Sequence, residues 1–159
     1  YKITLNQVSP THLKEMLSDL EDIFASGKIE LLCSPVQSGS NRILKLMGRM
    51  HTAEEWTQCM LKINRRFPSI RLKTHFMVGF PTETDEDFRA TLRLLDYPLF
   101  LDSIGIFKFS ERPTVYASRM QGQISEKTKE LRRKKLLRKY AYMYAFNVAI
   151  RAKNALFRA

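Results

Sequence analysis

The sequence has few of the residues that bind metal ions or form disulfides. It contains two cysteines, Cys33 and Cys59, which lie far apart. Two cysteines are too few for a disulfide framework, and their separation gives no ligand spacing for zinc or an iron–sulfur cluster, so we expect two small buried side chains. None of the three histidines is at ligand spacing from carboxylates. His12 and His51 are expected on the surface, whereas His75 lies inside an apolar strand.

Other features are missing altogether. No apolar run approaches the ~18–20 residues that cross a bilayer, and no signal peptide opens the chain. The phosphate loop GxxxxGK[ST], the zinc motif HExxH and the elbow GxSxG are also absent. With so few cysteines, a reducing cytoplasm is the predicted location. Because Tyr1 already reads as part of a strand, we expect an excised piece of a longer protein.

Acidic residues are also scarce. The 159 residues include 27 Lys and Arg against 16 Asp and Glu, a formal net charge of +11. This excess indicates either an anionic partner such as nucleic acid or the solvated surface of a fragment that has lost an acidic neighbour.

Many of the cations lie in one predicted helix that begins at Ser125. It is open to three interpretations: a packing helix with a solvated basic face, a helix that binds RNA phosphates, or a membrane-surface helix with an aromatic end. The candidate nucleic-acid contacts are Lys127, Lys129, Arg132, Arg133, Lys134, Lys135, Arg138 and Lys139.

The remaining pattern alternates strands with helices. Strands are predicted at residues 1–5, 29–32, 70–78 and 102–109. Helices are predicted from Ser9 to Gly27, over 41–48, from a capping box at Thr52 to Pro68, from a second box at Thr84, and from Ser125. Four such βα units predict an α/β fold with a parallel sheet, either open or half of an eight-unit barrel. Residues 1–123 would form this partial barrel and residues 124–159 a basic, aromatic terminal helix.

Polar residues follow the predicted strands, where α/β proteins hold their ligands. Gln37 and Ser38 lie in a polar elbow between a strand and a helix, and an amide such as that of Gln37 suits ribose hydroxyls. Arg49 is suited to clamping a carboxylate. Gly79 permits close approach of a flat ligand, against which Phe80 or Phe109 would lie. A nucleoside that carries an amino acid would fit a site formed by these residues at the carboxyl ends of the strands.

Three segments together resemble a known family. They are PVQSGSNRILKLMGR at 35–49, VGFPTETDEDF at 78–88 and FKFSERP at 107–113, the last being similar to a YSxRPGTxA segment. In order and spacing they resemble the radical S-adenosylmethionine (SAM) methylthiotransferases over about residues 1–133. The resemblance implies βα units three to six of a TIM-like radical SAM barrel. Members attach methylthio groups to tRNA adenosines or to a ribosomal protein aspartate.

The resemblance also implies cofactors and their contacts. One 4Fe–4S cluster in such enzymes cleaves SAM to a 5′-deoxyadenosyl radical, and a second cluster in an amino-terminal domain is associated with sulfur insertion. Gln37 and Arg49 would contact the ribose and amino-acid part of SAM, and residues 78–80 would line the adenine site. The candidate cofactor-binding residues are Gln37, Ser38, Arg49, His75, Val78, Gly79, Phe80 and Phe109.

Several positions depart from the family pattern. The CxxxCxxC cluster loop is absent, so the cluster would belong to the parent protein, and this chain should contain no catalytic or metal-ligating residue and be inactive alone. His75 stands where relatives have an Asp that accepts from ribose, and Thr82 stands where they have glycine. Residues 112–117 lack the glycine of RPGT. Beyond Arg133 no resemblance to the family's RNA-binding domain remains.

Two other functions stay open: a different radical SAM oxidoreductase or transferase, and a non-catalytic, basic RNA-binding module. The expected partners are a tRNA or ribosomal protein substrate and the missing half of the barrel. Self-association through exposed sheet edges, led by residues 1–5, is also expected.

Overall fold

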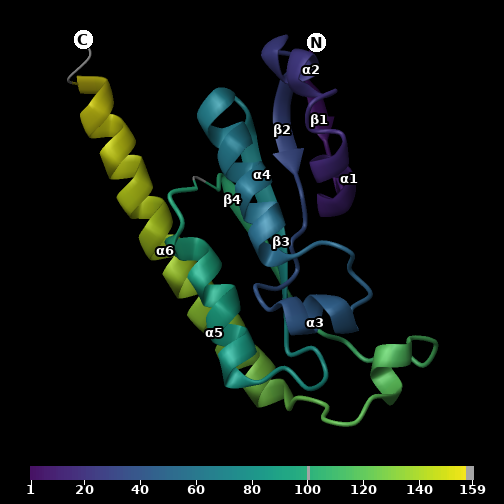
Figure 1. Ribbon diagram of the computed structural model, residues 1–159. Helices are drawn as coiled ribbons and strands as arrows, with labels where there is room; N and C mark the ends of the chain where they lie inside the picture. Colours follow the sequence, from purple (N-terminus) through teal and green to yellow (C-terminus); the bar gives the residue numbers. More distant parts are fainter. Residues whose placement is uncertain (100, 157–159) are drawn as a thin grey trace.

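Four parallel strands form one sheet, in the order in which they occur along the chain (Figure 1). The computed structural model describes residues 1–99 and 101–156, with side-chain surroundings up to residue 150. The strands are β1 (Ile3–Leu5), β2 (Ile29–Cys33), β3 (Arg71–Val78) and β4 (Ser103–Lys108). A doubly wound sheet reverses its strand order, whereas a barrel does not. The sequential order therefore agrees with a partial barrel and confirms the predicted α/β class.

Helices follow the strands as predicted, with one exception. The helices are α1 (Pro10–Glu15), α2 (Glu21–Ala25), α3 (Asn41–Leu46), α4 (Ala53–Arg66), α5 (Asp85–Arg93) and α6 (Glu126–Leu156), with 3-10 turns η1 (Leu94–Asp96) and η2 (Tyr116–Arg119). Both capping boxes form. The helix expected from Ser9 to Gly27 is broken into α1 and α2. The break contains Ser18 and Asp19, which hydrogen-bond to each other and are weak helix formers.

The helices cover one face of the sheet. Along β3, Leu72, Thr74 and Phe76 are buried beneath them, whereas Lys73, His75 and Met77 on the other face are only half-buried. We call the face that carries Lys73, His75 and Met77 the inner face, because it corresponds to the interior of a barrel.

The core lies between the sheet and the helices. Trp56 from α4 is fully buried, and its indole N–H donates to the Ser34 carbonyl oxygen at 3.1 Å. Cys33 and Cys59 are buried, as predicted. The prediction for His51 was wrong: this side chain is buried, its Nε2 lies 3.4 Å from the Val36 oxygen, and burial lowers its pKa.

The edges of the sheet are β1 and β4, which each pair with a single strand among the described residues. The expected self-association and the pairing with a missing barrel half remain predictions. Within residues 1–99 and 101–156, no helix is both long enough and apolar enough to cross a membrane.

The first half of α6 packs against the body of the protein, and its second half extends beyond α5 (Figure 1). Leu136 is fully buried, and the Tyr140 hydroxyl donates to the carbonyl oxygens of Leu101 and Asp102. Burial raises the pKa of Tyr140 to about 12, so the hydroxyl stays protonated as a donor. The boundary predicted between residues 123 and 124 stays a prediction, and residues 157–159 of that segment lie outside the described residues.

A buried ion pair joins α6 to the loop after β3. Arg132 Nη1 donates to Glu83 Oε2 at 2.7 Å, and its Nη2 donates to Asp85 Oδ1 at 2.8 Å. The same Glu83 oxygen accepts from the Gly79 backbone N–H at 2.8 Å. Burial raises the pKa of Glu83, and the Gly79 N–H and Arg132 oppose that shift. Arg132 therefore favours the charged form of a buried carboxyl group at the end of β3.

We predict that Arg132→Ala lowers the free energy of unfolding by about 3–5 kcal/mol, because it leaves Glu83 buried without its partner. Urea denaturation at pH 7.5 measures this. Arg133→Ala is the control, since Arg133 pairs with Glu130 on a half-exposed part of α6, and it should cost no more than about 1 kcal/mol.

The deficit of Arg132→Ala should depend on pH. Without Arg132 the folded-state pKa of Glu83 rises further above its unfolded value of about 4.3. When a carboxyl group has a folded-state pKa above its unfolded-state pKa, the free energy of unfolding falls as pH rises between the two values. The stability deficit of Arg132→Ala should therefore shrink when pH is lowered from 7.5 toward 5. Equal deficits at both pH values would contradict a role in holding Glu83 charged.

Candidate functional site

The polar elbow between β2 and α3 is fastened to α5. The Gly39 N–H donates to Thr91 Oγ1 at 2.9 Å, and Ser38 Oγ lies 3.3 Å from the same hydroxyl. Gly39 is required for this close approach, because a Cβ there would lie 2.4 Å from the Ala90 carbonyl oxygen. The small residues after Gln37 thus let the elbow touch the backbone of α5.

Asp87 is the common acceptor at this contact. It caps α5 through Thr84, accepts from Ser40 Oγ at 2.6 Å and forms an ion pair with Arg42. Burial disfavours the charged form, but the hydrogen bonds from Arg42, Ser40 and Thr84 outweigh burial and hold the pKa of Asp87 well below its usual range. The charged Asp87 side chain therefore links the elbow and α3 to the start of α5 at neutral pH.

This arrangement places Gln37 at the carboxyl end of the sheet. Its N–H donates to the His75 oxygen at 2.9 Å, and its own oxygen accepts from Met77 N–H at 2.8 Å. Its φ of 70° lies in the left-handed region, which is uncommon for a residue other than glycine. The backbone of Gln37 is thus held between two residues of β3, and its side chain lines a cavity.

The cavity has a volume of about 290 Å³. Its polar lining side chains are Gln37 and Arg49, neither of which has a side-chain hydrogen bond or ion pair within the described part of the chain. Phe80 and Phe109 meet edge to face in its wall, with ring centroids 5.4 Å apart. The remaining lining residues are Leu46, Met47, Met77, Val115, Tyr116 and Ala117.

Four of the eight residues predicted to bind a cofactor meet here: Gln37, Arg49, Phe80 and Phe109. Two others, Ser38 and Val78, do not reach the cavity. Ser38 is fully buried against Thr91 of α5. Val78 is fully buried in the core beneath the helices, on the opposite side of β3 from Met77.

Gly79 and His75 have surroundings that the sequence did not indicate. The side chain of Lys129 from α6 fills the space that a Cβ of Gly79 would occupy. The group that approaches Gly79 closely is therefore this lysine and not the flat ligand that the sequence had suggested. His75 lies on the inner face and contributes its backbone oxygen to Gln37. Its ring lies between Gln7 and Cys33, at 3.4 Å and 3.8 Å, and burial lowers its pKa, with a smaller effect from Lys73.

Sequence reasoning missed the sulfur-rich part of the cavity wall. Met47 follows α3, and Met77 is on the inner face two residues after His75. Strand alternation, which placed Met77 with His75, was the available signal. Tyr116 comes from η2, in a loop whose position no local pattern indicates.

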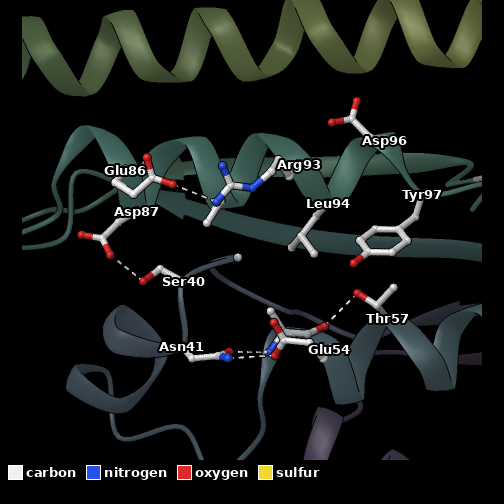
Figure 2. Close-up of a pocket in the computed structure, with 13 residues that line it drawn as sticks. Ser40, Asn41, Glu54, Thr57, Glu86, Asp87, Arg93, Leu94, Asp96 and Tyr97 are labelled. Carbon is white, nitrogen blue, oxygen red and sulfur yellow. Dashed lines mark hydrogen bonds and ion pairs between the residues drawn. The ribbon is translucent and has the colours of Figure 1, made fainter.

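A larger cavity, of about 530 Å³, lies between α4 and α5 (Figure 2). Most of its polar side chains already have partners: Asn41 pairs with Glu54, Ser40 with Asp87, Arg93 with Glu86, and Asp96 with Lys139 of α6. It shares no lining residue with the cavity at Gln37, which is the one that the end of β3 lines through Met77. We therefore take the smaller cavity as the candidate site.

The eight predicted nucleic-acid contacts divide by exposure. Lys129 and Arg132 are 2% and 6% exposed and are engaged inside the protein, so the prediction of an RNA-facing role does not hold for them. Arg133 and Lys139 are half-buried and pair with Glu130 and Asp96. The other four are exposed: Lys127, Lys134, Lys135 and Arg138.

Comparison with known proteins identifies the family. A model described as the Radical SAM superfamily matches residues 2–95. The chain belongs to the radical SAM superfamily. Its structure resembles coproporphyrinogen III oxidase from Escherichia coli, a radical SAM enzyme, with a TM-score of 0.70 and 21% identity over 89% of this chain and 32% of that one. The archaeal Elp3 of Methanocaldococcus infernus gives a TM-score of 0.56 at 20% identity, covering 75% and 27%. These likenesses show the fold.

Curated relatives in the superfamily are methylthiotransferases, which confirms the resemblance in the sequence. The tRNA-2-methylthio-N(6)-dimethylallyladenosine synthase of Acetivibrio thermocellus is 40% identical over 131 residues, 80% of this chain and 27% of the relative. The ribosomal protein uS12 methylthiotransferase RimO of Clostridium botulinum is 40% identical over 120 residues, 74% and 26% of the two chains. The chain thus spans about a quarter of the length of these relatives.

We predict that Gly39→Ala lowers the free energy of unfolding by about 1–3 kcal/mol, because the new methyl group meets the rigid backbone of α5. Thermal or urea unfolding measures the loss. Ser69→Ala, at an exposed position, should change stability by no more than about 0.5 kcal/mol. A fully stable Gly39→Ala variant would show that the elbow does not touch α5 as described.

Proposed function

We propose that this chain forms part of the SAM-binding wall of a radical SAM methylthiotransferase. The observation that carries the proposal is the cavity at the strand ends. Gln37 and Arg49 offer unpaired donors there, beside aromatic and thioether side chains. Few convergent polar groups in a mostly apolar cavity are typical of a cofactor site.

The chemistry of the lining fits SAM. Phe80 and Phe109 provide aromatic surface for the adenine, and Met47 and Met77 add polarizable sulfur at ring edges. The Gln37 amide both donates and accepts, as ribose hydroxyls require. The Arg49 guanidinium is suited to the carboxylate of the methionine part.

The residues present do not fit an iron–sulfur cluster. Among residues 1–99 and 101–156, no group of three His, Cys, Asp or Glu side chains could hold a metal ion. The two cysteines are both buried. Any cluster of the parent enzyme would need ligands from outside this chain, and we assign it no step here.

The roles of the chain's own residues follow from the cavity. Bound SAM supplies the adenosyl group with which enzymes of this superfamily begin hydrogen abstraction. Gln37 fixes the ribose, because its backbone is held between His75 and Met77. Arg49 sets the position of the amino-acid part, and the wall of Phe80, Phe109 and Met77 excludes water from the adenosine.

The wider assignments rest on the relatives. The Acetivibrio and Clostridium enzymes act, by their names, on a tRNA adenosine and on ribosomal protein uS12. We propose one of these as the substrate of the parent protein and the cytoplasm as its location. The alternative of another radical SAM reaction stays open at His75 and Thr82, where the sequence departs from the family pattern.

We predict that Arg49→Ala weakens SAM binding by about tenfold or more, because it removes a charged hydrogen bond to the carboxylate. Binding of 5′-methylthioadenosine, which lacks that carboxylate, should be unchanged. Isothermal titration calorimetry of the chain with both ligands measures the difference. Arg65→Ala, an exposed arginine on α4, should affect neither ligand, and equal losses for the two ligands in Arg49→Ala would contradict the assigned role.

The chain by itself should not cleave SAM, even after iron–sulfur reconstitution, since it lacks a ligand set for the cluster. Chromatographic assay for 5′-deoxyadenosine under reducing, anaerobic conditions tests this. Any product above the level of a protein-free control would overturn the prediction.

A further inference from the structure

The two sides of α6 have different environments. Lys129, Arg132, Leu136, Tyr140 and Met143 recur every three or four residues and face the body, where the first three are buried and the last two pack on the core. This spacing keeps them on one side of the helix. The opposite side of α6 is therefore fixed toward solvent along the same length.

That outward side carries both cations and aromatic rings. We define the basic-aromatic strip as Lys134, Lys135, Arg138, Tyr142 and Phe146. Tyr142 is 72% exposed and Phe146 is 52% exposed, and the three cations are also exposed. Positions 134, 138, 142 and 146 are spaced by four residues, so successive members lie about 6 Å apart along the helix. The strip is about 18 Å long.

The cations of the strip form few ion pairs with carboxylates of the protein itself. Lys134 lies 3.9 Å from Glu130, a marginal distance, and within the described part of the chain Lys135 and Arg138 have no carboxylate within 4 Å. Lys129 and Arg132 on the inward side, by contrast, are paired with Glu126, Glu83 and Asp85. The strip is thus positive charge available to an anionic partner, in a chain of net charge +11.

The order of groups on the strip distinguishes between anionic partners. A helix that lies on a membrane places its charges on one face and its aromatic residues on the other. Here both kinds share one face, with cations first and rings after them. Single-stranded nucleic acid needs this combination, because cations contact its phosphates and aromatic side chains stack on its unpaired bases.

We propose that the basic-aromatic strip binds single-stranded RNA, with Lys134, Lys135 and Arg138 on phosphates and Tyr142 and Phe146 stacked on bases. Arg132 and Lys129 join the inward side of α6 to the loop that carries Gly79, so the helix that presents the strip is fixed to the body of the protein. The inference does not depend on the cofactor cavity, and SAM binding and RNA binding can fail separately.

The test is binding of a fluorescent oligouridylate of 15 nucleotides to the whole chain, by anisotropy at several salt concentrations. The parent chain should bind, and its affinity should fall with salt. The triple variant Lys134→Ala/Lys135→Ala/Arg138→Ala should reduce the slope of log K against log salt by about 2, since each phosphate contact on a single strand contributes about 0.7. The charge-matched control Lys28→Ala/Lys45→Ala/Arg65→Ala changes exposed cations elsewhere and should keep most of the slope.

The aromatic half is tested with Tyr142→Ala/Phe146→Ala. Affinity for oligouridylate should fall by about tenfold or more, whereas binding to heparin, an anionic polymer without bases, should not change. Tyr1→Ala/Tyr97→Ala is the matched control. Circular dichroism and unfolding midpoints of all variants should match the parent, because every substituted side chain is exposed in part.

Three results would overturn the proposal. One is absence of oligouridylate binding at low salt. The second is an equal loss of affinity in the strip variants and their controls, which would mean nonspecific charge attraction. The third is a strip-dependent association with vesicles of phosphatidylserine and phosphatidylcholine, or of the chain with itself, without strip-dependent RNA binding.

Discussion

The contact between the polar elbow and α5 is the constraint on which the candidate site depends. Gly39 allows two backbones to meet, and the charge of Asp87 holds Ser40 and Arg42 against the start of α5. With the elbow fixed in this way, Gln37 has to join β3 and its side chain faces the cavity. The segment that resembles the family motif is therefore mainly structural, and it leaves the polar side chains of Gln37 and Arg49 unpaired among the described residues in the cavity wall.

A second constraint acts from the far end of the chain. Arg132 and Lys129 of α6 pack against the loop after β3, where Arg132 balances a buried carboxylate and Lys129 fills the space beside Gly79. The wall that carries Phe80 is thus held by the elbow on one side and by α6 on the other. One helix side serves this internal packing, and this leaves the other side free to meet a partner.

Strand alternation and capping boxes predicted most of the fold, because periodic apolar residues and Thr52 or Thr84 determine local structure directly. They could not choose between an open sheet and a barrel, since strand order is set by contacts distant in sequence. For the site, Gln37 and Arg49 were predicted from their side-chain chemistry and their positions after a strand and a helix, and the family resemblance then assigned them to SAM. Ser38 and Val78 were predicted without asking which side of the chain their side chains occupy. Helical spacing would have shown that Lys129 and Arg132 face inward. Tyr116 could not have been found, because its loop is positioned by tertiary packing.

The central claim is that the cavity at Gln37 receives the adenosine part of SAM, and the methionines of the chain can report on it. The chain can be labelled with ¹³C at its methionine methyl groups and titrated with S-adenosylhomocysteine. An adenine ring in the cavity should shift the signals of Met47 and Met77, which line it, and leave those of Met60 in the core and Met143 on α6 unchanged. Shifts at Met60 or Met143 without shifts at Met47 and Met77 would contradict the account.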